Sequence, residues 1–354
     1  MEILPASTPA LFEAAVLRAA AHLRQGGVAV LPTETVYGLA ANAFDPAAIA
    51  LVYRIKGRPP HNPVIVHVSN LEMARDCAES WPPSASRLAS AFWPGPLTLV
   101  LPRSNLIPDI VTAGGPTVAV RFPGHPIMRA VIDACGFPLA APSANLSGQV
   151  SPTTCLHAAQ ALAGRVSVLV DGGPCQVGIE STVVDLSADS PRVLRPGMIS
   201  AESIELILGR NPRGAPPPRS CVTPKPLGAA TLRSPGLLEK HYAPRARVLV
   251  WTWKNQQGLE ERLSGAGTVD GPVHVMAHAS IPLQARLGVP FSVSIIPNDP
   301  EAFARALYSE MLSCDTRGVK TLIVEAVPST PAWEGIADRL RRAASEFEKG
   351  SAES

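Results

Sequence analysis

The chain has 354 residues, of which 46% are hydrophobic and only 5% aromatic, and its formal net charge at pH 7 is +2. This length exceeds what one hydrophobic core usually holds, so two domains are expected, with cores of Ala, Val, Leu and Ile. The small net charge does not by itself indicate a nucleic-acid or membrane partner. No apolar run is long enough to span a membrane, and Glu2 stands where a secretory signal is basic, so we expect a soluble, cytoplasmic protein.

Two common signatures of metal and nucleotide sites are missing from the sequence. The cysteines have no close pairs, a spacing that favours neither a zinc site nor a disulfide framework, so reduced thiols are expected. They are Cys77, Cys135, Cys155, Cys175, Cys221 and Cys314. No G-x-x-x-x-G-K-[ST] phosphate loop occurs, so any nucleotide must be held by side chains and irregular loops.

The first predicted elements alternate between helices and apolar strands. An apolar stripe predicts a helix over residues 9–24, and a β-branched run predicts a buried strand over 28–31. Asp45 is a good N-cap with proline at the next position, which predicts a helix over 45–54. Residues 64–68 are apolar almost throughout, and a strand that is apolar on both faces indicates a sheet covered on both sides.

The same alternation continues along the rest of the first domain, which is expected to span residues 1–208. Helices are predicted over 71–79, 84–92 and 126–135, and strands over 97–101, 117–121, 138–141, 166–170 and 182–186. Several of these strands are joined by turns too short for a crossover. We therefore predict an α/β fold with a twisted, open, mixed sheet flanked by helices.

A change of composition follows the first domain. Residues 209–245 are rich in Pro, Gly and Ser, which predicts a semi-extended linker. A new pattern then predicts a smaller α/β, Rossmann-like domain over residues 246–345 and a tail over 346–354. Strands are predicted in this domain over 248–251, 273–276 and 321–325, and helices over 301–312 and 336–347.

Four cationic residues, Lys56, Arg58, Arg121 and Arg195, lie beside predicted strand ends or turns. Taken singly, an arginine is more often a solvated or ion-paired surface residue, and that alternative stays open here. However, only 17% of the chain is charged, and the glycine between Lys56 and Arg58 lets a polyanion approach the backbone closely. Since the planar arginine fork donates two parallel hydrogen bonds to phosphate, these positions favour a phosphate ligand.

Several motifs follow one another in a fixed order over the first two-thirds of the chain. They are Pro32–Leu39, Lys56–Pro59, Asn62–Pro63, Val66–Val68, Pro142–Gly148, Ser151–Thr153, Glu180–Asp185, Arg195–Gly197 and His241–Pro244. In these residues the chain closely resembles the YrdC-like family, in the long, two-domain form of the threonylcarbamoyl-AMP synthases. One such motif would be a weak signal, whereas the ordered set is strong.

The resemblance implies a nucleotidyltransferase. Bicarbonate would carboxylate the amine of L-threonine, and the carbamate would attack the α-phosphorus of ATP, which releases pyrophosphate and forms L-threonylcarbamoyl-AMP. Such a reaction requires positioning and charge neutralisation rather than a covalent nucleophile. Mg²⁺ is expected, bound mainly through the ATP phosphates. The tRNA threonylcarbamoyl-transfer machinery would use the product to modify the adenosine beside the anticodon, and direct tRNA binding is expected to be weak or absent.

The resemblance also implies the residues of the site. The ATP-binding positions are Lys56, Arg58, Asn62, Thr117, Ser143, Asn145, Ser151, Arg195 and Tyr242. The threonine-binding positions are Thr35, His67, Arg121, Ala141 and Ser181. The linker would close over this active site. Glu34 and Glu180 stand next to hydroxyl residues and could orient donors, but the sequence assigns no general base.

Other interpretations stay open at this point. Ser143, Asn145 and Ser151 also suit turns in which such side chains bond their own backbone, and His67 also suits a satisfied core histidine. An RNA-binding module is a second candidate function, although basic residues are sparse and no aromatic stacking platform is visible. A carbamoyltransferase of the hydrogenase-maturation kind is a third, but such chains add zinc-finger cysteine pairs that are missing from this sequence.

Overall fold

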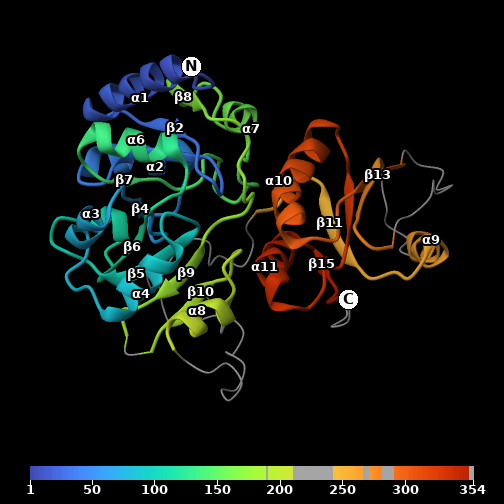
Figure 1. Cartoon of the computed structure of the whole chain (residues 1–354). Helices are drawn as coiled ribbons and strands as arrows, with labels where there is room; N and C mark the ends of the chain where they lie inside the picture. Colours follow the sequence, from blue (N-terminus) through green and yellow to red (C-terminus); the bar gives the residue numbers. More distant parts are fainter. Residues whose placement is uncertain (189, 210–241, 266–270, 281–290, 351–354) are drawn as a thin grey trace. The chain divides into compact units, whose positions relative to one another are not determined.

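The computed structural model describes residues 1–188, 190–209, 242–265, 271–280 and 291–350. These residues form two compact units (Figure 1). The first contains the described parts of Met1–Ser147 and Ser151–Leu238, and the second those of Gly148–Val150 and Glu239–Ser354. Within the described ranges, no helix is long and apolar enough to cross a membrane. Most of the predicted linker, residues 210–241, lies outside these ranges.

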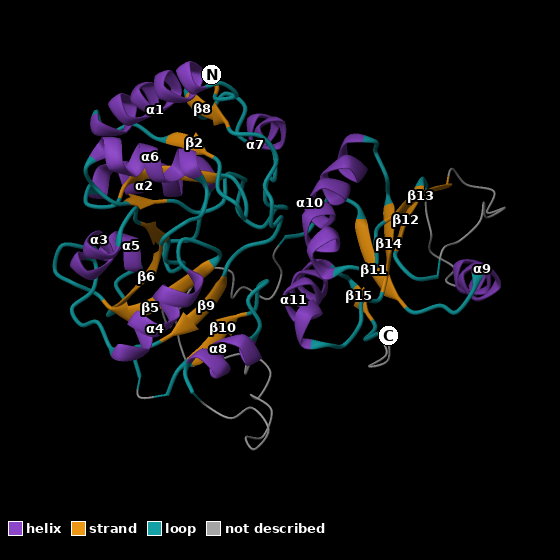
Figure 2. Ribbon diagram, viewed as in Figure 1, coloured by secondary structure: helices purple, strands orange, loops and turns teal. Residues whose placement is uncertain are grey.

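A ten-stranded sheet runs through the first unit in the order β1-β8-β2-β3-β7-β4-β6-β5-β9-β10. Figure 2 shows strands of this sheet in orange and the helices in purple. The strands are β1 (Glu2–Pro5), β2 (Ala29–Leu31), β3 (Gly38–Asn42), β4 (Ile65–His67), β5 (Leu97–Pro102), β6 (Thr117–Arg121), β7 (Leu139–Ala140), β8 (Val168–Asp171), β9 (Thr182–Asp185) and β10 (Arg192–Arg195). β2 pairs antiparallel with β3, whereas β4 pairs parallel with β6 and β5 with β9. The predicted mixed sheet is therefore confirmed.

Helices pack on the sheet, and their ends follow from the local sequence. They are α1 (Pro9–Arg24), α2 (Pro46–Lys56), α3 (Leu71–Asp76), α4 (Pro83–Phe92), α5 (Asp109–Thr112), α6 (Pro126–Cys135), α7 (Cys155–Ala161) and α8 (Ala201–Ile207). At the start of α2, Asp45 Oδ1 accepts hydrogen bonds from the amides of Ala47 at 2.9 Å and Ala48 at 3.3 Å. Gly57 ends α2 with a φ of 59°, in the left-handed region that favours glycine.

Alternate residues of a strand point to opposite faces of the sheet and so meet different helices. In β2, Ala29 and Leu31 pack in one core with α1 and α6, whereas Val30 packs in another with α2 and α7. Around β5 and β9, Leu97 and Leu99 pack in a third core with α4 and α8. The predicted runs are apolar because helices pack on both faces of the sheet around β2.

The other face of the β5–β9 half carries part of the candidate site. A small buried cluster takes one residue from each of four strands: Ile65, Val100, Ala119 and Val183. Two residues away along the same strands, and therefore on the same face, the polar positions are His67, Thr98, Arg121 and Ser181. Within the described part of the chain, the helices contribute no residue to this cluster. We call this surface the site face.

The second unit is built on a five-stranded sheet in the order β13-β12-β14-β11-β15, and its paired strands all run parallel. Its elements are β11 (Arg247–Trp251), α9 (Gln256–Gly265), β12 (Val273–Ala277), β13 (Phe291–Ile295), α10 (Pro300–Thr316), β14 (Thr321–Glu325), η1 (Pro331–Trp333), α11 (Glu334–Ala343) and β15 (Glu346–Phe347). Leu249 and Trp251 of β11 pack with Leu259 of α9 in one core. This arrangement is the smaller α/β fold that the sequence predicts.

Some elements differ from the predicted ones. The predicted helix 336–347 ends at Ala343, because Ala344 is extended, and Glu346–Phe347 instead pairs with β11 as β15. The sequence predicts neither β1 nor β3. Residues Gly38–Asn42 have low intrinsic strand propensity, and they form β3 because β2 and β7 pair with them on either side.

The described cysteines are all free and buried. They are Cys77, Cys135, Cys155, Cys175 and Cys314. Burial raises the pKa of Cys77 to about 12 and that of Cys135 to about 11. The expectation of reduced thiols is confirmed for these residues, and Cys221 lies outside the described ranges.

Candidate active site

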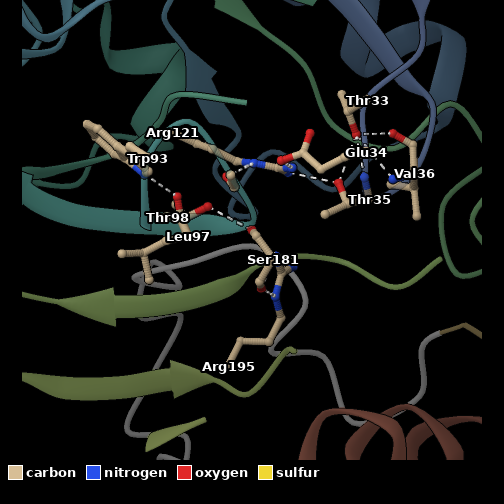
Figure 3. A network of polar contacts seen from close by, with 11 residues as sticks. Thr33, Glu34, Thr35, Val36, Trp93, Leu97, Thr98, Arg121, Ser181 and Arg195 are labelled. Carbon is tan, nitrogen blue, oxygen red and sulfur yellow. Dashed lines mark hydrogen bonds and ion pairs between the residues drawn. The ribbon is translucent and has the colours of Figure 1, made fainter. Parts of the chain in front are cut away.

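The turn after β2 presents two adjacent polar side chains to the site face. Thr33 Oγ1 accepts hydrogen bonds from the amides of Thr35 and Val36, both at 3.2 Å, and donates to the carbonyl of Val36 at 2.6 Å. A threonine hydroxyl that bonds its own backbone in this way fixes a tight turn. The turn places Glu34 and Thr35 beside Arg121 of β6 (Figure 3).

Arg121 is held by three partners, two from the turn after β2 and one from the turn before β5. Its Nη2 lies 2.7 Å from Glu34 Oε1, its Nη1 donates to Thr35 Oγ1 at 2.9 Å, and its Nε donates to the carbonyl of Gly95 at 3.3 Å. The side chains of Arg121 and Glu34 are only 4% and 10% exposed. Burial alone would raise the pKa of Glu34, but the Arg121 guanidinium together with a hydrogen bond from the backbone of Gly124 outweighs it and holds that pKa below its ordinary value. The pair is therefore ionised.

His67 lies beside this ion pair, because His67 of β4 and Arg121 of β6 are register partners. Burial, followed by the nearby positive charge of Arg121, lowers the pKa of His67 to about 3. The imidazole is therefore neutral at physiological pH, and its Nδ1 has no hydrogen-bond partner among the described residues. Ala141 follows β7 and donates its amide to the carbonyl of Ile65 at 3.0 Å, so it reaches β4 close to His67.

A second buried group joins β5, the turn before β9, and β10. Ser181 Oγ lies 2.7 Å from Thr98 Oγ1 and accepts from Arg195 Nη2 at 3.2 Å (Figure 3). The Arg195 guanidinium also donates to the carbonyl of Ser181, from Nε at 3.1 Å and from Nη2 at 3.0 Å. The threonine position Ser181 and the ATP position Arg195 are therefore direct neighbours. Thr98 completes the group, although the sequence does not single it out.

Lys56 ties the end of α2 to the Pro142–Gly148 loop. Its ammonium donates to the carbonyl oxygens of Ser143 and Asn145 and, at 3.3 Å, to Asn145 Oδ1. In return, the amide of Ser147 donates to the carbonyl of Lys56 at 2.9 Å. Burial, and then the charge of nearby Arg58, lowers the pKa of Lys56 well below its ordinary value.

Arg58 organises the loop that follows α2. Its Nε and Nη2 donate to the carbonyl and Oδ1 of Asn62 at 2.9 and 2.7 Å, and Nη2 also donates at 2.5 Å to the carbonyl of Pro63. Tyr53 from α2 supports the same loop, because its hydroxyl donates to the Asn62 carbonyl at 2.8 Å. The guanidinium carbon of Arg58 lies 6.0 Å from the centre of the Tyr53 ring.

The remaining predicted positions are placed less closely together. Ser151 Oγ donates to Glu180 Oε1 at 2.6 Å, one residue before Ser181 in the chain. Thr117 begins β6 on the same face as Arg121, four residues earlier. Tyr242 belongs to the second unit, where its ring stacks on that of Tyr308 with centres 5.9 Å apart.

These contacts join the predicted positions of the first unit into several small buried groups. Lys56, Arg58, Arg121 and Arg195 are between 2% and 8% exposed, so interpreting them as solvated surface residues is wrong. Sequence reasoning missed two partners, Thr33 and Thr98. A sequence feature could have pointed to Thr33, since a threonine two residues before another hydroxyl residue suits a tight turn. Thr98 stands in an apolar strand, where no sequence feature points to it.

Comparisons with known proteins cover nearly the whole chain. Residues 21–197 match the protein family described as telomere recombination, and residues 199–345 match the family described as threonylcarbamoyl-AMP synthase, C-terminal domain. A threonylcarbamoyl-AMP synthase from Pyrococcus abyssi is 37% identical over 330 residues, which are 92% of this chain and 92% of the relative. One from Bacillus subtilis is 38% identical over 338 residues, which are 93% and 92% of the two chains.

The chain is similar to solved structures as well. The crystal structure of Pyrococcus abyssi Sua5 complexed with L-threonine matches with a TM-score of 0.83 and 33% sequence identity. The match covers 98% of this chain and 100% of that one. A double-alanine variant of the same protein matches with the same TM-score and identity. These likenesses extend over both units.

Proposed function

The chain belongs to the threonylcarbamoyl-AMP synthase family and is an enzyme of tRNA modification that makes L-threonylcarbamoyl-AMP, and we propose that L-threonine, bicarbonate and ATP react on the site face of its first unit. One observation carries this placement. Two buried guanidinium groups lie on one sheet, that of Arg121 on β6 and that of Arg195 on β10, each beside hydroxyl groups. A carboxylate and a polyphosphate each require such donors.

The threonine end of the site is proposed around Arg121. The related Pyrococcus abyssi protein has been crystallised with L-threonine. In this chain, Arg121 would receive the carboxylate, while Thr35, His67, Ala141 and Ser181 would line the rest of the amino acid. The neutral imidazole of His67 suits this place, because its free Nδ1 can bond a polar group of the ligand without adding charge.

The ATP end is proposed around the remaining cations. Lys56 and Arg58 lie at the end of α2, and Arg195 adjoins Ser181. We propose that these residues neutralise the triphosphate, and that Asn62, Thr117, Ser143, Asn145 and Ser151 contribute further contacts with the nucleotide. Since pyrophosphate leaves with several negative charges, fixed donors at this end would stabilise the transition state more than the ground state.

Mg²⁺ is proposed to reach the site on ATP. In the described part of the chain, no three His, Cys, Asp or Glu side chains are grouped so that they could hold a metal ion. The two acidic residues at the site also have other partners, Arg121 for Glu34 and Ser151 for Glu180. This donor set fits a magnesium ion that keeps its waters and is bound mainly by phosphate oxygens.

The surroundings of the enzyme are proposed from the same family membership. The product would pass to the proteins that transfer the threonylcarbamoyl group to tRNA. The expectations that direct tRNA binding is weak or absent and that the protein acts in the cytoplasm stay predictions.

An omission assay tests the proposed reaction. The full chain is incubated with ATP, Mg²⁺, L-threonine and bicarbonate, and pyrophosphate and the adenylate product are measured while each substrate is left out in turn. We expect pyrophosphate release to require both threonine and bicarbonate. Release that continues without threonine would refute the reaction, and L-serine in place of threonine tests the fit of the methyl group.

A further inference from the structure

Glu34 is a buried carboxylate whose nearest charge is that of a residue proposed to bind the substrate carboxylate. Its Oε1 lies 2.7 Å from Arg121 Nη2, and its backbone carbonyl accepts from the amide of Val177 at 2.7 Å. On another side, Gly124 packs so closely that a side chain there would begin 3.5 Å from the carboxyl group. Glu34 is therefore fixed in place and faces Arg121 (Figure 3).

The other titratable groups around Glu34 are neutral at physiological pH. Burial lowers the pKa of His67 to about 3 and also lowers that of His125, and burial raises the pKa of the Cys175 thiol to about 12. Arg121 is therefore the charge that decides whether Glu34 can accept a proton.

The proposed reaction requires a base at this place. The α-amino group of threonine is protonated in neutral solution and then has no lone pair with which to attack bicarbonate. In an α-amino acid, the ammonium and the carboxylate are attached to the same carbon. A threonine whose carboxylate binds Arg121 therefore brings its ammonium next to the residue that Arg121 already contacts.

Resting on the proposed function, we propose that Glu34 is the general base that removes a proton from the α-ammonium of threonine. One N–H bond breaks and one O–H bond forms on Glu34, which leaves a neutral amine. The amine lone pair then attacks the carbon of bicarbonate, and the oxygen that leaves takes the second amine proton and departs as water, which gives the carbamate. Glu34 returns its proton to solvent when the product leaves.

Binding of the substrate itself would switch this base on. While Arg121 is paired with Glu34, the pKa of Glu34 is low and the carboxylate is a poor base. A substrate carboxylate on Arg121 shares the guanidinium charge, and the burial of Glu34 then favours its neutral, protonated form. The free enzyme would thus hold an inactive carboxylate that becomes basic only beside bound threonine.

Glu34→Gln tests this role, because it keeps the shape of the side chain and cannot accept the proton. Synthesis of threonylcarbamoyl-AMP should fall by about 100-fold or more. The reverse adenylyl transfer, in which threonylcarbamoyl-AMP and pyrophosphate give ATP and the threonine carbamate, needs no amine proton transfer. Its loss, caused only by the weaker hold on Arg121, should therefore be at least about tenfold smaller than the loss of synthesis. The synthesis rate of the variant should also rise by about tenfold per pH unit, as the free amine forms in solution.

The matched control is Thr35→Val, which removes the neighbouring hydrogen bond to Arg121 and leaves Glu34 in place. It should slow the two directions by the same factor. Equal losses of both directions in Glu34→Gln, or unchanged synthesis, would overturn the proposal. A reverse reaction that remains measurable shows that the variant is folded. If Glu34→Gln does not fold, Glu34→Asp should slow synthesis more than the reverse reaction, and an equal effect overturns the proposal. A wild-type enzyme that runs neither direction would instead refute the proposed function.

Discussion

Lys56 shows how a cation in a candidate phosphate loop also serves the fold. Its ammonium has three protons, and three acceptors from Ser143 and Asn145 surround it. The lysine is 2% exposed, so water cannot replace these bonds. Any contribution that Ser143 and Asn145 make to ATP binding therefore depends on Lys56 holding their backbone.

Lys56→Met keeps the length of the side chain but leaves those buried oxygens without a donor. We expect the free energy of unfolding of the first unit to fall by about 1–3 kcal/mol, and the affinity for ATP to fall with it. Urea denaturation and an ATP titration measure the two effects. Lys254→Met, at an exposed lysine, is the control and should change neither quantity. A Lys56→Met variant as stable as the wild type would contradict this role.

The buried histidine of the site gives a prediction about pH. Between the ordinary pKa of 6.5 and the folded-state pKa of about 3, the unfolded chain binds a proton on His67 that the folded protein does not. His67 should therefore make stability rise with pH by about 1.4 kcal/mol per unit in this window. His67→Gln should lower the slope of stability against pH by that amount, measured by urea denaturation between about pH 4 and 6. If stability rose equally steeply with pH in the wild type and in His67→Gln, His67 would be protonated in the folded protein.

Among the elements, β9 and β10 fix the relation between the two ends of the site. Arg195 ends β10 and donates to Ser181, and two residues later Gly197 packs against the backbone where β9 begins. A Cβ atom on Gly197 would lie 2.5 Å from the Thr182 amide nitrogen. Only glycine allows this approach, so the spacing from Arg195 to Gly197 has a steric cause.

Gly197→Ala should therefore push the turn after β10 away from β9. We expect a loss of about 1–3 kcal/mol in stability, as for other overpacked positions, and a lower kcat/KM because Arg195 shifts relative to Ser181. Thermal unfolding and the pyrophosphate assay measure both. In contrast, Gly258→Ala in α9 has room for its methyl group, whose Cβ would lie 3.6 Å from Asn255 Oδ1. This substitution should raise the free energy of unfolding by about 0.5–1 kcal/mol. Equal effects at the two glycines would contradict this steric explanation.

The sequence predicts elements well where their causes are local. The Asp45-Pro46 start of α2 and the apolar runs of β4 and β6 each have a local signal, and the structure confirms them. The predicted end of α2 at residue 54 is wrong by two residues, because the helix continues to Lys56 and Gly57 ends it. Strand β3 has none, because pairing with β2 and β7 decides it.

For the site, too, the sequence predicts local features but not long-range pairing. Its cations and hydroxyl residues could be named from motifs, but which of them pair could not. The contact of Arg121 with Glu34 and that of Ser181 with Thr98 join residues more than 80 positions apart. Only the strand order of the sheet brings those residues together.

At the scale of the whole molecule, the first unit holds all the predicted site residues except Tyr242, whereas the second has its own parallel sheet. A putative threonylcarbamoyl-AMP synthase from Mycobacterium tuberculosis is 40% identical over 195 residues, which are 55% of this chain but 89% of that protein. A protein little longer than the first unit therefore exists in the family. The longer chain thus invites the question of what residues beyond 208 add.

We predict that the residues beyond 208 help to keep water from the adenylate, as the resemblance implies. A chain cut near residue 210 should still bind ATP, but net accumulation of threonylcarbamoyl-AMP should fall by about tenfold or more, because the product hydrolyses before release. Isothermal titration with ATP and product quantification over time measure the two properties. An unchanged product yield would count against this role.

The central claim is that one face of the first unit receives both substrates. A crystal structure of the full chain with L-threonine and a non-hydrolysable ATP analogue tests it most directly. We predict that the threonine carboxylate lies on Arg121 with its amino group beside Glu34, and that the polyphosphate lies within reach of Lys56, Arg58 and Arg195. Threonine bound away from Arg121, or a nucleotide bound only to the second unit, would contradict the account.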